Sequence, residues 1–261
     1  MANIHPTACV DSAAELADDV KVGPYAVIYA GAKIGAGCEI GPHAVIHGWT
    51  RLGERVKVHA HAVLGDDPQD LHFDTAQESY VIVGNDTVLR EGVTLHRATV
   101  EGAATTVGKN CLFMAYAHAA HDAKVGDNAI LANNVMMAGH SEIEPYAVVG
   151  GGVGLHQSNR IGEGAMIGGV SRVSNDAPPF CMVSGESKLY GLNLIGMKRR
   201  GFSRETIREI KLLYHALYDE SCNLKKKATE LLETVESDEA RRFLTFFTNS
   251  KRGVFATPER K

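Results

Sequence analysis

Residues 20–47 read VKVGPYAVIYAGAKIGAGCEIGPHAVIH, with an aliphatic side chain at every sixth position. Stepping by six from this stretch in both directions meets no polar residue at any of eleven positions. With about 45% of positions apolar, such a run arises by chance in one register with a probability on the order of 0.0002. The period of six therefore reflects the fold. The eleven positions are Ile4, Val10, Leu16, Val22, Ile28, Ile34, Ile40, Ile46, Leu52, Val58 and Leu64.

A second position repeats with the same period. Four residues after each aliphatic position the chain places small or β-branched residues, such as Ala26, Ala32 and Cys38. A short strand every six residues, separated by Gly-, Asn- or Asp-rich corners, can wind into a prism with three strands and about 18 residues per coil. The sequence therefore predicts a mainly β fold, a parallel β-helix of hexapeptide repeats with about eight coils and a length of roughly 40 Å.

The repeat occupies residues 1–180 and is interrupted twice, near 66–82 and near 101–106. We expect inserted loops at both places, because the period resumes after each of them. The period ends at Pro178, where two consecutive prolines cannot donate to a strand ladder.

The remainder of the chain, residues 181–261, has a helical pattern. Ser203 is typical of a helix N-cap, and the residues that follow it are apolar on one helical face. Two further amphipathic stretches lie at about 223–236 and 238–249. We therefore expect a small α-helical C-terminal domain.

Composition excludes several classes of protein. The net charge is only −4, so no general affinity for nucleic acid follows. There is no run of 18 apolar residues and no secretory signal at the N-terminus, and we expect a cytoplasmic protein with no membrane insertion. The five cysteines have no Cys-x-x-Cys spacing, and Cys38 and Cys111 occupy positions of the repeat that require a small buried side chain.

The histidines of the second half gather on one edge of the predicted prism. Adding 18 to a residue number, or 24 across the second interruption, moves one coil along the same column. His96, His121, His140 and His156 then fall in three adjacent columns at one edge, on four successive coils, with Asp122 beside them. Such an edge fits a zinc site, as in the γ-class carbonic anhydrases that share the hexapeptide β-helix. It also fits acid–base catalysis, in which one imidazole accepts a proton from a hydroxyl and its neighbours bind substrate.

Six segments carry a resemblance to a known family. They read AYAHAAHD at 115–122, LANN at 131–134, AGH at 138–140, HQ at 156–157, GLN at 191–193 and KRRGFSR at 198–204. In this order and spacing the chain resembles the acyl-ACP:UDP-N-acetylglucosamine O-acyltransferases of lipid A biosynthesis, over essentially its full length.

The resemblance implies a left-handed β-helix, a homotrimer, and transfer of a 3-hydroxy fatty acyl group from acyl carrier protein to the 3-position of UDP-N-acetylglucosamine. It implies no cofactor apart from the acyl-phosphopantetheine that acyl carrier protein delivers, and no metal. His121 matches the general base that removes the proton from the sugar 3-hydroxyl. Asp122 matches the carboxylate that follows the base, and the N–H of Gly139 matches the oxyanion-hole donor.

Further positions match the family's substrate contacts. Gly169 matches the position where side-chain bulk limits the acyl groove, and a glycine there favours a longer acyl chain. His72, Ser158 and Ile195 depart from the family's usual residues, which bears on the nucleotide contacts and on the sugar. The expected substrate-binding residues are Asp70, His72, His118, His140, His156, Gln157, Asn193, Arg199 and Arg200.

Three other functions stay open on the sequence. An N-acyltransferase could act on a 3-amino sugar or on a later lipid A intermediate, although the later enzyme carries an N-terminal uridine-binding domain and here the repeat begins at Ile4. A zinc enzyme related to the γ-class carbonic anhydrases would use the same histidines as ligands. A non-catalytic scaffold would leave the dense edge of ionisable residues without a role.

Overall fold

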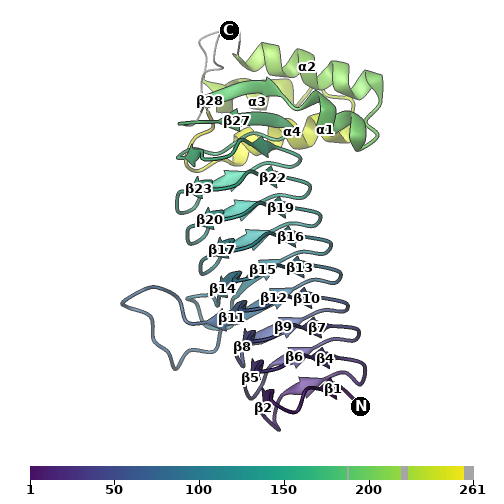
Figure 1. Ribbon diagram of the computed structural model, residues 1–261. Coiled ribbons are helices and arrows are strands. Elements are labelled where there is room, and N and C mark those ends of the chain that lie inside the picture. Colours follow the sequence, from purple (N-terminus) through teal and green to yellow (C-terminus); the bar gives the residue numbers. More distant parts are fainter. Residues whose placement is uncertain (187, 219–222, 256–261) are drawn as a thin grey trace.

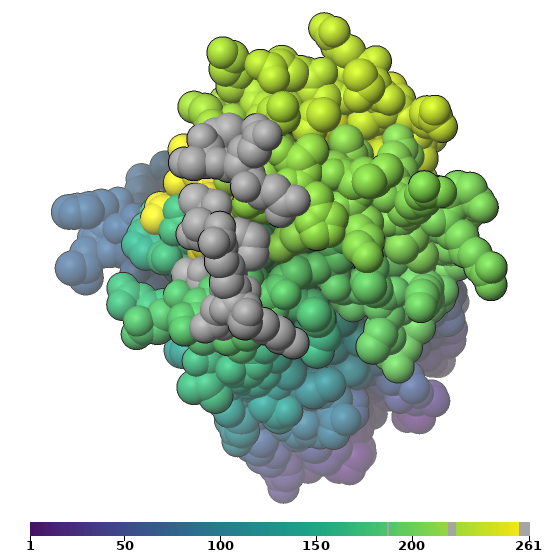
Figure 2. Space-filling view, turned by 90° about the horizontal axis from the view of Figure 1, so that it is seen from above, coloured from purple at the N-terminus to yellow at the C-terminus, as the bar shows by residue number. Residues whose placement is uncertain are grey.

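The computed structural model describes residues 1–186, 188–218 and 223–255. The chain winds as a tall prism whose coils stack along one axis, with the helices gathered at the C-terminal end (Figure 1). Seen along this axis, the helical residues cover the end of the prism (Figure 2). Among the described residues, no helix combines the length and the apolar character that a membrane span needs.

Three sheets form the faces of the prism, and we name them A, B and C in the order in which each coil visits them. All pairings are parallel except that of β28 with β27. Sheet A contains β1 (Asn3–Ile4), β4 (Lys21–Val22), β7 (Glu39–Ile40), β10 (Lys57–Val58), β13 (Val88–Leu89), β16 (Leu112–Phe113), β19 (Ile130–Leu131), β22 (Val148–Val149), β25 (Met166–Ile167), β27 (Cys181–Ser184) and β28 (Lys188–Leu192). Sheet B contains β2 (Cys9–Val10), β5 (Val27–Ile28), β8 (Val45–Ile46), β11 (Val63–Asp66), β14 (Thr94–His96), β17 (His118–Ala119), β20 (Met136–Met137), β23 (Gly154–Leu155) and β26 (Arg172–Val173). Sheet C contains β3 (Glu15–Leu16), β6 (Lys33–Ile34), β9 (Thr50–Leu52), β12 (Tyr80–Val83), β15 (Ala104–Val107), β18 (Lys124–Val125), β21 (Glu142–Ile143) and β24 (Arg160–Ile161).

The period of six follows from this geometry. In a two-residue strand the first side chain points outward and the second points into the prism, so Ile28 and Ile46 are fully buried while Lys21 is exposed. At most corners the chain turns through a left-handed residue, for example Tyr25 (φ 57°) and His43 (φ 56°), one coil apart. The predicted inward series is therefore confirmed, apart from Ile4 in the first coil, which remains 42% exposed.

The first inserted loop is shorter than the sequence indicated, and the second begins and ends earlier in the chain. The first spans residues 67–79, because residues 80–83 form β12. The second lies at 97–103, and the expectation of a loop near 101–106 was wrong for residues 104–106, which belong to β15 and pair with β12. β15 has two inward residues, Thr105 and Val107, and the buried polar Thr105 hid the first part of the strand from a search for apolar side chains.

The two ends of the prism differ. At the C-terminal end, β27 and β28 continue sheet A and α1 (Leu194–Arg199), α2 (Arg204–Tyr218), α3 (Leu224–Leu231) and α4 (Asp238–Asn249) follow. The first coil has no such cover. A division into two domains at residue 180 stays a prediction, because β27 pairs with β25 across that boundary, and residues 187, 219–222 and 256–261 of the expected second domain lie outside the described residues.

The helices assemble on the pattern that the sequence predicts. The Ser203 hydroxyl accepts a hydrogen bond from Thr206 N at 3.0 Å, which caps α2. The apolar faces of α2 and α4 meet, with Leu217, Phe243 and Phe247 buried. α3 ends at Leu231, before the predicted limit of 236.

Candidate active site

The predicted histidine edge exists, at the corner where each coil passes from sheet B to sheet C. His121 and Asp122 follow β17, and Gly139 and His140 follow β20 one coil above. His140 N donates to His121 O at 3.0 Å, and both Asp122 (φ 59°) and His140 (φ 58°) are left-handed corner residues. The stacking of identical corners therefore places side chains 18 residues apart directly above one another.

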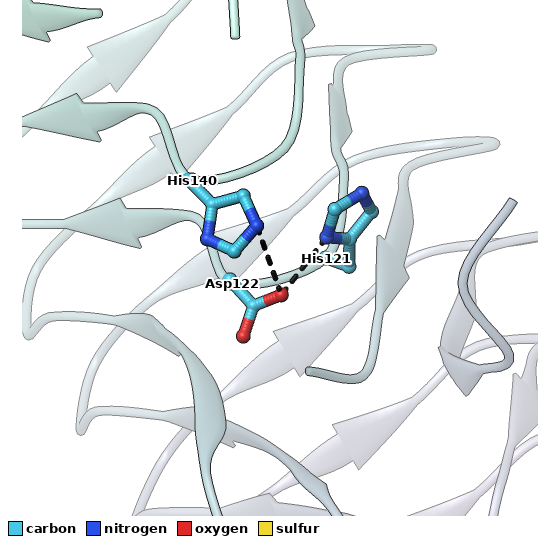
Figure 3. A group of neighbouring side chains, drawn as sticks. All are labelled: His121, Asp122 and His140. Carbon is cyan, nitrogen blue, oxygen red and sulfur yellow. Dashed lines mark hydrogen bonds and ion pairs between the residues drawn. The ribbon is translucent and has the colours of Figure 1, made fainter. Parts of the chain in front are cut away.

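His121 and Asp122 form a pair (Figure 3). His121 Nδ1 lies 2.9 Å from Asp122 Oδ2, and the same carboxylate oxygen accepts hydrogen bonds from Thr99 N at 3.1 Å and from Thr99 Oγ1 at 2.7 Å. Burial alone would raise the pKa of Asp122, but the bonds from Thr99 and His121 outweigh it and hold this pKa below its usual range. An ionised carboxylate at Nδ1 favours the tautomer with the proton on Nδ1, which leaves Nε2 able to accept a proton.

Gly139 lies directly over the His121 ring. A Cβ atom added to Gly139 would lie 2.4 Å from His121 Cε1 and 2.5 Å from Nε2, closer than side chains can pack. Glycine is thus the residue that lets the backbone of the next coil approach the reactive nitrogen. A ligand atom bound at Nε2 would also adjoin the backbone of Gly139.

His118 and His96 form a second imidazole pair on the same side of the prism. His118 Nδ1 lies 2.7 Å from Thr94 Oγ1, and its ring meets the His96 ring edge-on with centroids 4.9 Å apart. Burial lowers the pKa of His118 to about 4, and burial also lowers the pKa of His96. Both rings are therefore neutral near pH 7 and can exchange hydrogen bonds with a polar ligand without adding charge.

The other residues expected on this edge are exposed. His156 and Gln157 follow β23, one coil above Gly139, and His156 Nδ1 lies 3.2 Å from Gln157 O. Asp70 and His72 belong to the inserted loop at 67–79, where Asp70 Oδ1 accepts a hydrogen bond from His72 N at 2.9 Å. This loop leaves the same B–C corner and projects sideways from the prism (Figures 1 and 2).

Four expected site residues lie at other corners of the same chain. Gly169 follows β25 at the corner between sheets A and B. Asn193 caps α1 by accepting a hydrogen bond from Gly196 N at 2.9 Å, and its amide donates to Gly164 O at the corner between sheets C and A. Arg199, in the last turn of α1, is exposed. One chain alone does not bring these residues to His121.

Arg200, the fourth of these residues, is already paired within the chain. Its guanidinium forms an ion pair with Glu163, which also pairs with Arg242 at 2.7 Å. The Arg200 guanidinium also lies 4.2 Å from the centre of the Tyr146 ring. A phosphate bound by Arg200 would therefore have to share it with Glu163.

Sequence reasoning missed Thr99 and Arg97, both in or next to the second inserted loop. Arg97 is 1% exposed, donates to Asp67 Oδ1 at 2.8 Å, to Thr75 O at 3.0 Å and to Gln77 O, and lies against the rings of Phe73 and Trp49. It thereby holds the first inserted loop to the prism. The only signal in the sequence was that Arg97 begins the column of His121.

Comparisons with known proteins agree with this geometry. Residues 176–255 match a family described as "Udp N-acetylglucosamine O-acyltransferase; Domain 2", and residues 13–48, 33–66 and 104–139 match the bacterial transferase hexapeptide repeat. The acyl-[acyl-carrier-protein]--UDP-N-acetylglucosamine O-acyltransferase of Thiobacillus denitrificans is 46% identical over 97% of this chain and 99% of its own. That of Aliarcobacter butzleri is 44% identical over 97% and 98%.

Solved structures give the same result. The UDP-N-acetylglucosamine acyltransferase of Francisella novicida matches with a TM-score of 0.94 at 34% identity, over 98% of this chain and 95% of its own. The enzyme of Campylobacter jejuni matches with a TM-score of 0.91 at 36% identity, over 97% and 99%. These likenesses confirm the predicted fold class, a left-handed parallel β-helix with a small helical C-terminal part. The chain belongs to the UDP-N-acetylglucosamine O-acyltransferase family.

Proposed function

We propose that this protein transfers a fatty acyl group, with a 3-hydroxy acyl chain preferred, from acyl carrier protein to the 3-position of UDP-N-acetylglucosamine, the first step of lipid A synthesis. The enzyme class is the one that the relatives' names state. The observation that carries the mechanism is the pair of His121 and Asp122 beneath Gly139, on an exposed corner of the prism.

The proposed reaction gives a role to Asp122, to His121 and to the N–H of Gly139. Asp122 holds the proton on His121 Nδ1, so Nε2 takes the proton of the sugar 3-hydroxyl as its oxygen attacks the thioester carbonyl. The carbonyl oxygen becomes an oxyanion, to which the N–H of Gly139 donates. When the carbon–sulfur bond breaks, His121 returns the proton to the departing phosphopantetheine thiolate. General-base catalysis of this kind contributes roughly 10²–10⁴-fold in rate.

The neighbouring side chains bind the substrates. His118, neutral because burial lowers its pKa to about 4, offers a hydrogen bond beside the base. His140, His156 and Gln157 line the exposed corner above it, and Asp70 and His72 approach from the inserted loop. Gly169 leaves room in the acyl groove, which favours a longer acyl chain.

The complete site forms between copies of the chain in a homotrimer. Asn193, Arg199, Arg200 and Gly169 lie at corners other than that of His121, so a neighbouring copy has to supply them to the same substrate. Sheet A also presents an outward apolar ladder towards the helical end of the prism. Nearer the N-terminal end, the outward residues of the same sheet are the charged Lys21, Glu39 and Lys57. The ladder comprises Leu112, Ile130, Val148, Met166 and Met182, of which Met166 is 45% exposed.

Such a ladder suits a contact that repeats around a threefold axis. The mass of the protein in solution tests this assembly, and a monomeric mass at micromolar concentration would contradict it.

Two further features stay predictions. We expect no cofactor other than the phosphopantetheine that carries the acyl group. A cytoplasmic location is supported by Cys9, Cys38, Cys111 and Cys181, which are free thiols and suit a reducing compartment.

Product analysis tests the proposed reaction. The protein is incubated with a mixture of acyl carrier protein thioesters of several chain lengths, with and without a 3-hydroxyl, and with UDP-N-acetylglucosamine or its 3-amino analogue. Mass spectrometry should detect an ester of UDP-N-acetylglucosamine with a 3-hydroxy acyl chain. An amide formed only with the 3-amino sugar would identify an N-acyltransferase, and no acylated nucleotide from any mixture would refute the proposal.

A further inference from the structure

Three potential metal ligands converge at the proposed base. His121 Nδ1, Asp122 Oδ2 and His140 Nε2 belong to the one group in the described ranges whose ligand atoms all lie within 4.8 Å of one another. Asp122 Oδ2 lies between the two imidazoles, 2.9 Å from His121 Nδ1 and 3.7 Å from His140 Nε2 (Figure 3).

The spacing of these atoms suits zinc. Zn–N and Zn–O bonds of about 2.0–2.1 Å at tetrahedral angles separate neighbouring ligand atoms by about 3.3 Å. Two of the three separations, 2.9 and 3.7 Å, bracket this value, and the separation of the two imidazole nitrogens is below 4.8 Å. The His140 side chain is 45% exposed, so a small rotation about its own bonds can bring its nitrogen closer, while His121 and Asp122 are held by their surroundings.

The surroundings of the group are those of a metal site with an open position. Thr99 donates to the Asp122 carboxylate from N and Oγ1, and hydrogen bonds of this kind orient a ligating carboxylate. The rings of His121 and His140 are nearly perpendicular, at 86°, so they can approach one ion without overlapping. Three protein ligands leave the fourth tetrahedral position to water from the exposed side.

We propose that Zn²⁺ binds reversibly to His121, Asp122 and His140 and, in doing so, switches the general base off. A metal on Nδ1 uses the lone pair of that nitrogen, so the ring proton must move to Nε2. Nε2 is the atom that accepts the proton of the sugar hydroxyl, and a protonated Nε2 cannot accept it. Zinc at this site is therefore an inhibitor. The inhibition rests on the proposed role of His121 as general base, whereas the binding of zinc does not.

The choice of ion follows from the donors. Two imidazole nitrogens and one carboxylate suit borderline ions such as Zn²⁺, whereas Mg²⁺ prefers six oxygen ligands in octahedral geometry. Mg²⁺ serves as the matched control, and it should neither occupy the site nor displace zinc from it.

Direct binding tests the site without any assay of activity. Chelator-treated protein is titrated with ZnCl₂ by calorimetry, and a crystal soaked with zinc is examined for anomalous scattering. We expect one zinc per chain at His121, Asp122 and His140, and an affinity at least about tenfold lower in His140→Gln. The control is the double variant His43→Gln and His61→Gln, which alters two stacked imidazoles at another corner and should leave the affinity unchanged. Absence of binding, or equal affinity in His140→Gln, would overturn the proposal.

Acyl transfer then tests the switch. Zinc should suppress turnover at the concentrations that fill the site, a chelator should restore it, and His140→Gln should raise the inhibitory concentration by the same factor as it lowers affinity. Zinc bound at full occupancy with undiminished turnover would refute the inhibitory role. A zinc-dependent hydration of CO₂ would instead make zinc the catalytic ion. If the protein showed no acyl transfer, the calorimetry would still decide whether the site binds zinc.

Discussion

At the scale of single residues, the proposed chemistry depends on which nitrogen of His121 is free. Asp122, fixed by Thr99, keeps the proton on Nδ1 and leaves Nε2 facing the gap beneath Gly139. His121→Ala should lower kcat by roughly 10²–10⁴-fold, because the base is lost while the corner backbone remains. Steady-state kinetics and circular dichroism check both parts. His61→Ala, an exposed histidine at the A–B corner, is the control, and an unchanged rate in His121→Ala would remove His121 from the mechanism.

Gly139 tests the close approach of two coils. In Gly139→Ala the new methyl group would lie 2.4 Å from His121 Cε1, so the ring must leave its place. We expect kcat to fall at least about tenfold and the free energy of unfolding to fall by about 1–3 kcal/mol, as in other overpacked sites. In Gly154→Ala the added atom meets nothing closer than 4.0 Å, and this variant should keep both properties. Equal kinetics for the two variants would contradict the argument.

The burial of His118 should make the stability of the fold depend on pH. Burial lowers its pKa to about 4 from the ordinary 6.5 that it regains on unfolding. Between these values the unfolded chain binds more protons than the folded chain, so the free energy of unfolding should fall as the pH falls from about 6.5 towards 4. The loss should be about 2 kcal/mol between pH 6.5 and 5 and about 3 kcal/mol by pH 4. Urea unfolding at pH 7, 6 and 5 should show a steeper decline in the wild type than in His118→Gln; parallel declines would refute the shift.

At the scale of elements, the inserted loop at 67–79 is held by one buried cation. Arg97→Met should free the loop by removing the donors to Asp67, Thr75 O and Gln77 O. It should cost about 2–3 kcal/mol, the order of hydrogen bonds lost from a charged donor. We expect faster proteolysis within the loop and, since Asp70 and His72 lie on it, a higher KM for the nucleotide sugar. Arg90→Met, which loses only its exposed neighbour Glu91, is the control. Unchanged proteolysis would show that other contacts hold the loop.

The strands could be predicted because they are local. Each needs only an inward aliphatic residue and a corner, and both are written within six residues, as at Ile28 and Ile46. Residues 104–106 of β15 were placed in a loop because the first inward residue of this strand is Thr105, whose hydroxyl accepts a hydrogen bond from Asp122 N on the next coil. Polar residues buried for the sake of a distant partner leave no periodic signal.

The candidate site, too, could be predicted from the sequence only in part. Column arithmetic brings His121, Asp122 and His140 together, because the coil repeats every 18 residues there. It places Arg97 in the column of His121 but cannot indicate that Arg97 binds the first inserted loop. It also misses Thr99, which lies in the second inserted loop and binds Asp122. Nor can it indicate that Arg200 already faces Glu163, since that ion pair joins a corner residue to the end of a helix.

At the scale of the whole molecule, the apolar ladder on sheet A should hold the trimer together. Ile130→Asp places a charge at the middle of the ladder while its strand partners remain hydrogen-bonded. We expect a monomeric mass by light scattering together with a loss of acyl transfer, because a neighbour no longer completes the site. Lys124→Asp changes the outward residue on sheet C six residues earlier, at the end of the preceding coil, and should stay trimeric. A trimeric Ile130→Asp would move the interface to another face.

The two inserted loops show how the prism tolerates changes in length. Pairing across them is displaced by thirteen and by six residues relative to the regular coil, yet every strand above them resumes its column. Extra residues therefore leave the prism as a loop at the B–C corner, and the next strand begins in its usual column. Lineages can lengthen, shorten or rewrite these extruded segments, and so retune what the enzyme recognises, while the residues that perform the chemistry keep their positions.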